Sequence, residues 1–385
     1  MPSTTAEQPR LRVAVIYGGR SAEHEISLLS ARFVVESLDR ARFEPVLVGI
    51  DQLGRWRLQS EAALLSQPRD PRAVALDPAG ALLRLEAHPR RDGASGPGAL
   101  SRGRLVFDDG SALEIDAIFP VLHGPYGEDG CVQGLFALAD VPFVGAGVLG
   151  SAVGMDKDVM KRLLREAGLP IVPHRTLRAS AWARDREAVL ASLAELGLPC
   201  FVKPANLGSS VGISRVREAA GLAKALDEAF GFDEKVVVER GVSGVRELEC
   251  AVLGGDPPRA SIVGEIVVDH PDGFYSYAAK YVDEHGATTL VPARIEPEEE
   301  LRVQELALAC FEALECDGLA RVDFFRAESG ELYLNEINTL PGFTAISMYP
   351  KLWEASGLGG SALVDRLLDL AFERARRRAR LRTAV

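Results

Sequence analysis

At residues 321–342 the chain reads RVDFFRAESGELYLNEINTLPG, and this stretch predicts a β-hairpin. Two strand-like runs, with side chains that suit alternate faces of a sheet, flank Ser329-Gly330, a two-residue turn signal. A turn at that point places Asp323 directly opposite Glu336. The other expected elements connect to this hairpin.

Opposed carboxylates at about 4.5–5.5 Å repel each other, so Asp323 and Glu336 predict a cation between them. The same register puts Arg321 opposite Asn338, and alternation along a strand places Asn338 on the same face as Glu336. Three oxygen ligands on a rigid hairpin suit Mg²⁺. The alternative is an exposed sheet face whose charges are simply solvated.

Composition narrows the class of protein. The 385 residues are enough for two or three domains, and 47% hydrophobic residues is ordinary for a globular chain. The net charge of −11 argues against nucleic acid as a main partner. The five cysteines lack CxxC spacing, and no apolar run is long enough to span a membrane. Since residues 1–10 lack the apolar core of a signal peptide, we expect a cytoplasmic protein without membrane contact.

The N-terminal part predicts a parallel α/β domain, because residues 11–17 and 45–50 are strand-like and a Gly-Gly turn and a helix separate them. Glu23 opens that helix, where helix capping competes with a functional role. Residues 51–110 are interpreted as irregular. His123 lies in the loop HGPYGEDG at the end of a buried strand, and either a structural or a functional role is open.

Lys157 lies near the start of a predicted helix over 155–167, and a second helix is expected over 181–196. A strand then ends in the small-residue loop Lys203–Gly212, and another strand follows. Backbone N–H groups of such a loop can wrap phosphates; the alternative is a surface hairpin. The long polar connection at 270–292 is expected to be functional.

Seven motifs occur in order: GGRSAEHEISLLSA, HGPYGEDG, MDKDVMK, FVKPANLGSSVGI, VVVERGVSGVRELECAVLG, YAAKY, and RVDFF…NEINTLPGFTAISMYPKLWEASG. With them the chain resembles the D-alanine–D-alanine ligase family of ATP-grasp enzymes from about Leu11 to about Leu358. The resemblance implies an α/β, three-domain ATP-grasp fold with an N-terminal parallel α/β (pre-ATP-grasp) domain. The expected domains are an N-terminal substrate-binding domain at 1–150, a central lid at 151–240 and a catalytic domain at 241–385.

The resemblance also implies the chemistry. ATP phosphorylates the carboxylate of one D-alanine, the amine of a second D-alanine attacks the acyl phosphate, and the dipeptide product serves peptidoglycan precursor synthesis. The implied cofactors are ATP and two Mg²⁺ ions, with Mn²⁺ as an alternative metal. A homodimer is the implied assembly.

Residue roles follow by position in the motifs. The implied metal ligands are Asp323, Glu336 and Asn338. The implied ATP-binding residues are Lys157, Lys203, Ser209, Ser210, Glu239, Val242, Glu247 and Lys280.

On the substrate side, the resemblance implies that Glu23 holds the ammonium of the first D-alanine and, with Ser209 and Tyr281, locks the loops over the site. Arg321 and the N–H of Gly342 would form the oxyanion hole. The remaining implied substrate contacts are His123, near the first D-alanine, and Ser347, at the carboxylate of the second.

Two alternatives accompany this interpretation. A D-alanine–D-lactate ligase of the same family tends to have histidine where Tyr281 stands, so Tyr281 favours the dipeptide ligase. A non-catalytic nucleotide-binding regulator would lack metal ligands or basic groups that this chain retains. A DNA-binding role conflicts with the acidic charge balance.

Overall fold

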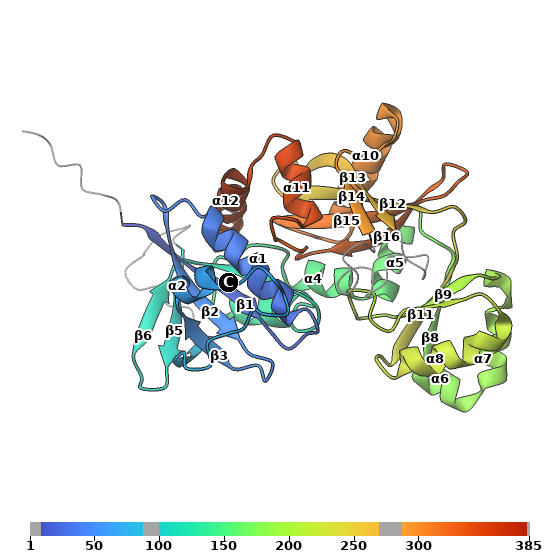
Figure 1. The fold of residues 1–385 in the computed structure, drawn as a ribbon, viewed down its shortest axis with the longest axis horizontal. Helices are drawn as coiled ribbons and strands as arrows, with labels where there is room; N and C mark the ends of the chain where they lie inside the picture. Colours follow the sequence, from blue (N-terminus) through green and yellow to red (C-terminus); the bar gives the residue numbers. More distant parts are fainter. Residues whose placement is uncertain (1–8, 88–99, 269–286, 383–385) are drawn as a thin grey trace, which may run out of the picture.

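The computed structural model describes residues 9–87, 100–268 and 287–382, and within them the strands form three sheets (Figure 1). The first sheet has the strand order β6-β5-β4-β3-β2-β1-β7. Its strands are β1 (Leu11–Gly18), β2 (Phe43–Ile50), β3 (Trp56–Gln59), β4 (Leu82–Leu85), β5 (Gly103–Phe107), β6 (Ala112–Ile115) and β7 (Ala117–Leu122). The helices that follow or cover them are α1 (His24–Ser37), α2 (Glu61–Ser66), α3 (Cys131–Leu138) and α4 (Val148–Met155).

The prediction of a parallel domain is correct for the centre of the first sheet and wrong for its extension. β1 runs parallel to β2 and β7, whereas the pairs from β2 to β6 are antiparallel. Three of these added strands, β3, β4 and β5, come from residues 51–110, which the sequence led us to interpret as irregular, and β6 follows directly after that range. Several are only four residues long, so their alternation is too brief to stand out from the Gly- and Pro-containing loops between them.

The second sheet has the order β10-β9-β11-β8, and all its pairs are antiparallel. It consists of β8 (His174–Arg178), β9 (Cys200–Pro204), β10 (Ser214–Val216) and β11 (Lys235–Arg240), with α6 (Ala179–Arg184), α7 (Arg186–Ser192) and α8 (Leu222–Phe230) beside it. The single helix predicted over 181–196 is interrupted, because the side chain of Asp185 accepts the N–H of Ala188 and starts a new helix there.

The third sheet, in the order β14-β13-β12-β15-β16, contains the predicted hairpin. Its strands are β12 (Arg246–Leu253), β13 (Arg259–Val268), β14 (Ala287–Leu290), β15 (Leu319–Arg326) and β16 (Leu332–Asn338). The associated helices are α5 (Lys157–Glu166), α10 (Pro297–Ala313), α11 (Met348–Ala355) and α12 (Gly360–Ala379). Apolar residues of β12 and β15 pack with α5 and α10 in one core, which leaves alternate residues of the same strands on the opposite face.

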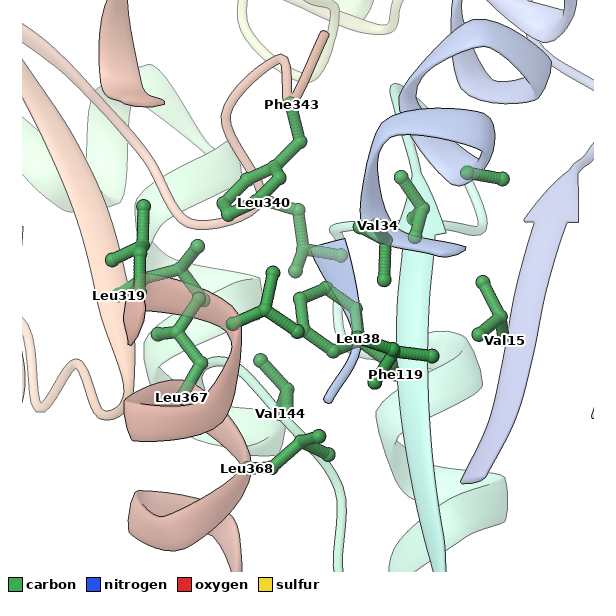
Figure 2. Packing of buried hydrophobic residues seen from close by; sticks show 14 of the residues in the cluster. Val15, Val34, Leu38, Phe119, Val144, Leu319, Leu340, Phe343, Leu367 and Leu368 are labelled. Atoms are coloured by element: carbon green, nitrogen blue, oxygen red, sulfur yellow. The ribbon is translucent and has the colours of Figure 1, made fainter. Parts of the chain in front are cut away.

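A second core joins the first and third sheets. In Figure 2, Val34 of α1, Leu38 directly after that helix and Phe119 of β7 belong to the same cluster as Leu367 and Leu368 of α12. Phe343 closes this core, with ring centroids 5.9 Å from Phe119 and 5.7 Å from Tyr349. Because Phe343 follows Gly342 directly, the buried ring fixes the loop that carries Gly342. No helix among the described residues is both long and apolar enough to cross a membrane.

Candidate active site

The hairpin of β15 and β16 has the predicted register at its functional end. Asp323 pairs with Glu336 and Arg321 with Asn338, as the sequence predicts. The predicted two-residue turn is wrong, however. Ala327 and Glu331 face each other across a three-residue loop, in which Gly330 takes the left-handed conformation at φ +90°.

A β-bulge on β16 compensates for the longer turn. The pairing shifts between Asp323 and Phe324, because Leu334 faces Phe324 and Asn335 is the extra residue. The bulge restores Glu336 to its place opposite Asp323. Both Asn335 and Glu336 line the same pocket, so the irregularity brings an additional polar side chain to the site.

Arg321 lies among carboxylates on the face of this sheet that lines the first pocket. It donates two hydrogen bonds of 2.7 Å to Asp323, one to each oxygen, and its Nε lies 3.1 Å from Oε2 of Glu249. Burial alone would lower the pKa of Arg321, but Asp323 and Glu249 outweigh it and hold the pKa well above its usual value. The guanidinium of Arg321 therefore supplies part of the positive charge that the opposed carboxylates of Asp323 and Glu336 require.

The oxygen donors of this face nevertheless fit a hard divalent cation. Asp323 and Glu336 face each other, and Asn338 adjoins them, donating a hydrogen bond from Nδ2 to Oδ2 of Asp323 at 3.0 Å. Within the described residues, no three Asp, Glu, His or Cys side chains are close enough to hold a metal ion by themselves. An ion here would therefore use the Asn338 amide oxygen and other ligands, as Mg²⁺ does when substrate phosphates and water complete its shell.

Two lysines face this hairpin from other elements. Lys157, at the start of α5, donates to the carbonyl of Leu207 at 2.6 Å and lies 3.6 Å from Oε2 of Glu336. Lys203, on β9, donates to Oδ1 of Asn335 at 3.2 Å. Their positive charges gather beside the carboxylates of the hairpin, which is an arrangement suited to polyphosphate with a metal ion.

Glu239 is a buried carboxylate that contacts two lysines, Lys161 and Lys203. Its side chain is 2% exposed, with Oε2 2.7 Å from Nζ of Lys203 and Oε1 2.9 Å from Nζ of Lys161. Burial alone would raise the pKa of Glu239, but the two ammonium groups more than reverse this effect and lower it. Glu239 is therefore ionised and anchors both lysines.

The loop after β9 reaches across to Glu23, the residue before α1. Ser209 donates a hydrogen bond from Oγ to Oε1 of Glu23, and Asn206 anchors the base of the loop on Asp233 at 2.8 and 2.9 Å. Ser209 and Ser210 adopt φ of +49° and +59°, a strained conformation for residues with a Cβ. The predicted contact between Glu23 and Ser209 is thus present. Tyr281, its predicted third member, and Lys280 lie outside the described residues.

His123 is buried and joins two loops. Its Nδ1 lies 3.1 Å from the carbonyl of Leu340, and its Nε2 lies 3.3 Å from Oγ of Ser30. Burial lowers the pKa of His123, and Glu23 only partly opposes this. Because a carbonyl only accepts, the neutral ring carries its proton on Nδ1. His123 therefore holds the HGPYGEDG loop against the loop before Gly342.

The predicted site residues that the structure describes line two adjoining pockets. The first pocket contains Lys157, Lys203, Ser210, Glu239, Val242, Glu247, Arg321, Asp323 and Glu336. The second pocket contains Glu23, His123, Ser209, Arg321, Glu336, Asn338, Gly342 and Ser347. Arg321 and Glu336 belong to both. The two pockets therefore adjoin at these two residues.

Four further residues belong to this region but received no role from the sequence. Glu249 contacts Arg321, Asn335 contacts Lys203, and Lys161 contacts Glu239. Glu128 accepts the N–H of Gly124 at 2.7 Å, and burial, followed by the charge of Glu23, raises its pKa to about 8. Sequence features could have indicated three of them: Glu249 alternates with Glu247 on one strand, Lys161 follows Lys157 by one helical turn, and Glu128 lies in the Gly-rich loop.

Comparison with known proteins identifies the family. Residues 12–146 match the family described as "D-ala D-ala ligase N-terminus", and residues 163–369 match "D-ala D-ala ligase C-terminus". The chain is 50% identical over 369 residues to D-alanine–D-alanine ligase A of Chromobacterium violaceum and 49% identical over 366 residues to that of Escherichia coli K12. In both cases the match covers 95% of this chain and 96% of the relative.

Solved structures agree with this assignment. The D-alanine–D-alanine ligase from Coxiella burnetii superposes with a TM-score of 0.79 at 36% identity, covering 97% of this chain and 96% of that one. The VanG D-Ala:D-Ser ligase from Enterococcus faecalis gives a TM-score of 0.79 at 35% identity, covering 94% and 100%. The chain belongs to the D-alanine–D-alanine ligase family and has the ATP-grasp fold.

Proposed function

We propose that this protein joins two D-alanine molecules at the expense of ATP, through a D-alanyl phosphate, to supply D-alanyl-D-alanine for peptidoglycan precursors. The observation that supports it most directly is the meeting of the two pockets at Arg321 and Glu336. Phosphoryl transfer followed by amine attack needs a nucleotide site and an amino-acid site with a shared reacting centre.

ATP and a divalent metal ion follow from membership of the family, and the number and identity of the ions are our proposal. ATP occupies the first pocket, with Lys157, Lys203, Lys280, Ser209 and Ser210 at the phosphates, and Glu239, Val242 and Glu247 at the base and ribose. Asp323, Glu336 and Asn338 would hold two Mg²⁺ ions, or Mn²⁺ in their place. The bound metal neutralises charge on the transferred phosphoryl group.

In the second pocket, Glu23 binds the ammonium of the first D-alanine and its contact with Ser209 keeps the loop closed over it. A carboxylate oxygen of this D-alanine attacks the γ-phosphorus and ADP leaves. Closure excludes water from the acyl phosphate, which would otherwise hydrolyse. Tyr281 is proposed to complete this closure, and His123 holds the neighbouring loop.

The second D-alanine binds with its carboxylate at Ser347, and its amine attacks the acyl carbonyl. Arg321 and the N–H of Gly342 stabilise the oxyanion that develops there. Ser347 lies close to Gly342, since a Cβ built on Gly342 would be 3.1 Å from Oγ of Ser347. Loss of phosphate and of a proton from the amine then gives the dipeptide.

Phosphate release with ATP, Mg²⁺ and D-alanine tests this function. D-alanine alone should support turnover and yield the dipeptide. Adding D-lactate or D-serine at pH 6 and pH 9 should not divert most of the product to the depsipeptide or the D-alanyl-D-serine product. D-serine is a relevant competitor because one of the similar solved structures is a D-Ala:D-Ser ligase. Absence of dipeptide in the presence of all components would overturn the proposal.

The remaining assignments are also proposals. We retain the division into 1–150, 151–240 and 241–385, which agrees with the segregation of the strands into separate sheets. The proposed homodimer comes from the resemblance, whereas the proposed cytoplasmic location and the absence of nucleic-acid and membrane partners come from residues 1–10, the net charge and the lack of a long apolar run. ATP and D-alanine are the proposed small-molecule partners. Light scattering on the purified chain tests the dimer.

A further inference from the structure

Lys161 is a buried lysine that the proposed chemistry does not use. It lies on α5, one helical turn after Lys157, but its side chain is only 1% exposed and it does not line the first pocket. Burying an ammonium group is costly unless a partner compensates for it, so a lysine at this position calls for a physical reason.

The partner of Lys161 is the carboxylate of Glu239, at 2.9 Å. The other oxygen of that carboxylate lies 2.7 Å from the ammonium of Lys203. Lys203, unlike Lys161, lines the first pocket, where its Nζ also lies 5.5 Å from the centre of the Phe325 ring and contacts Asn335. One buried carboxylate is therefore shared by two ammonium groups, of which only Lys203 reaches the pocket.

Because Lys161 and Lys203 share the Glu239 carboxylate, Glu239 does not fully neutralise the charge of Lys203 at the pocket. If Lys203 and Glu239 formed an isolated pair, their charges would cancel at the wall of the pocket. With Lys161 on the second oxygen, the cluster of Lys161, Glu239 and Lys203 keeps a net positive charge. Lys157 adds its own ammonium to the same pocket, opposite Glu336, so the excess positive charge lies where the polyphosphate would bind.

We propose that Lys161 is a positioning residue for nucleotide binding. By occupying one oxygen of Glu239, it fixes that carboxylate and leaves the charge of Lys203 available to the phosphates of the nucleotide. This inference rests on the proposed function, because it takes ATP as the occupant of the first pocket.

The test measures binding of ATP, ADP, AMP and adenosine by calorimetry with the wild-type chain, Lys161→Met and the double variant Lys161→Met/Glu239→Gln. Lys161→Met leaves Glu239 to neutralise Lys203, so ATP affinity should fall by about 10- to 100-fold, the range expected when a buried charged interaction is lost. Adenosine has no phosphate, and its affinity should change by less than about threefold, as for a site without that interaction.

The double variant supplies the decisive comparison. It removes both Lys161 and the carboxylate, so Lys203 regains an uncompensated charge. Glu239 is also proposed to contact the base and ribose, which ATP and adenosine share, so the ratio of ATP affinity to adenosine affinity should return toward the wild-type ratio. Lys161→Gln makes the same charge change if Lys161→Met does not fold. Arg374→Met is a matched control, because Arg374 is also a buried cation but lines neither pocket. It bonds the carbonyls of Phe143 and Gly145 and lies 3.6 Å from Asp317, so its loss should leave ATP affinity unchanged.

Equal losses for ATP and adenosine in Lys161→Met, or a ratio of ATP to adenosine affinity that does not recover in the folded double variant, would overturn the inference and indicate a purely structural lysine. Failure of the wild-type chain to bind ATP would overturn both the inference and the proposed function. Wild-type dipeptide synthesis with unchanged ATP affinity in Lys161→Met would overturn the inference alone.

Discussion

Arg321 and Asp323 are joined by two hydrogen bonds of 2.7 Å, one to each carboxylate oxygen, although they lie on the same strand two residues apart. Alternation puts both side chains on one face of β15, and the cross-strand neighbours Glu249 and Glu336 are acidic too. Arg321 therefore balances a row of carboxylates at the point where the two pockets meet.

Replacing Arg321 by lysine should lower kcat by at least about 100-fold, the loss seen when an oxyanion-hole donor is removed. A lysine ammonium is a point charge and cannot donate to both oxygens of Asp323 while remaining near Glu249. Steady-state phosphate release measures kcat, and thermal unfolding shows whether the variant stays folded. Arg326→Lys is the control, since Arg326 lies on the same strand but pairs with Glu299 and lines neither pocket. Similar kcat values for the two variants would contradict the role of Arg321.

Glu336→Ala should abolish ADP release that depends on D-alanine while the chain stays folded. The variant removes one of the proposed metal ligands and leaves Lys157 without its nearest hairpin carboxylate. Turnover should be measured across a range of Mg²⁺ concentrations. Glu331→Ala, an exposed carboxylate of the same hairpin that contacts Ser329 and Tyr333, should have little effect. Normal turnover in Glu336→Ala would show that the metal assignment is wrong.

Ser209→Ala should uncouple ATP hydrolysis from ligation, because the hydroxyl no longer holds the loop to Glu23. A hydrogen bond to a charged group contributes about 1.5–3 kcal/mol, so the ratio of ADP to dipeptide should rise by about tenfold or more. Ser209→Gly separates the two features of this residue. It relieves the backbone at φ +49° but also lacks the hydroxyl, so it should be equally uncoupled. Tight coupling in either variant would rule out the hydrogen bond as the latch.

The sequence predicted the site better than the architecture around it. Alternation within a strand is a local property, so the opposition of Asp323 and Glu336 could be derived from the hairpin alone. Even there, the predicted turn is one residue shorter than the actual loop, and the bulge at Asn335 restores the predicted register of Asp323 and Glu336. A bulge depends on cross-strand contacts that no single strand reveals.

Long-range contacts explain what could not be predicted. Lys161 and Glu239 are far apart in the sequence, and nothing in either segment indicates that they meet in the interior. The antiparallel extension of the first sheet depends similarly on short strands that become stable only when they pair. The positions of Glu23 and Ser209 agreed with the resemblance to the family, which carries three-dimensional information that local patterns lack.

Glu128→Gln should change how stability depends on pH in the absence of nucleotide and metal. Burial, and then the charge of Glu23, raises the pKa of Glu128 to about 8 from its ordinary value of 4.5. Between these values the folded chain retains a proton that the unfolded chain has released, so this residue's contribution to stability is lost as the pH rises through that window. Glutamine resembles the protonated carboxyl and can still accept the N–H of Gly124.

The variant should therefore match the wild-type chain near about pH 5 and become relatively more stable toward about pH 8, by up to a few kcal/mol in the free energy of unfolding. Urea unfolding at pH 5, 6.5 and 8 measures this difference. The relative gain arises because the unfolded wild-type chain is stabilised by releasing the Glu128 proton that the folded chain retains, whereas the amide ionises in neither state. A stability difference that stays constant over this range would mean that Glu128 ionises in the folded chain as readily as in the unfolded one, which would contradict the raised pKa.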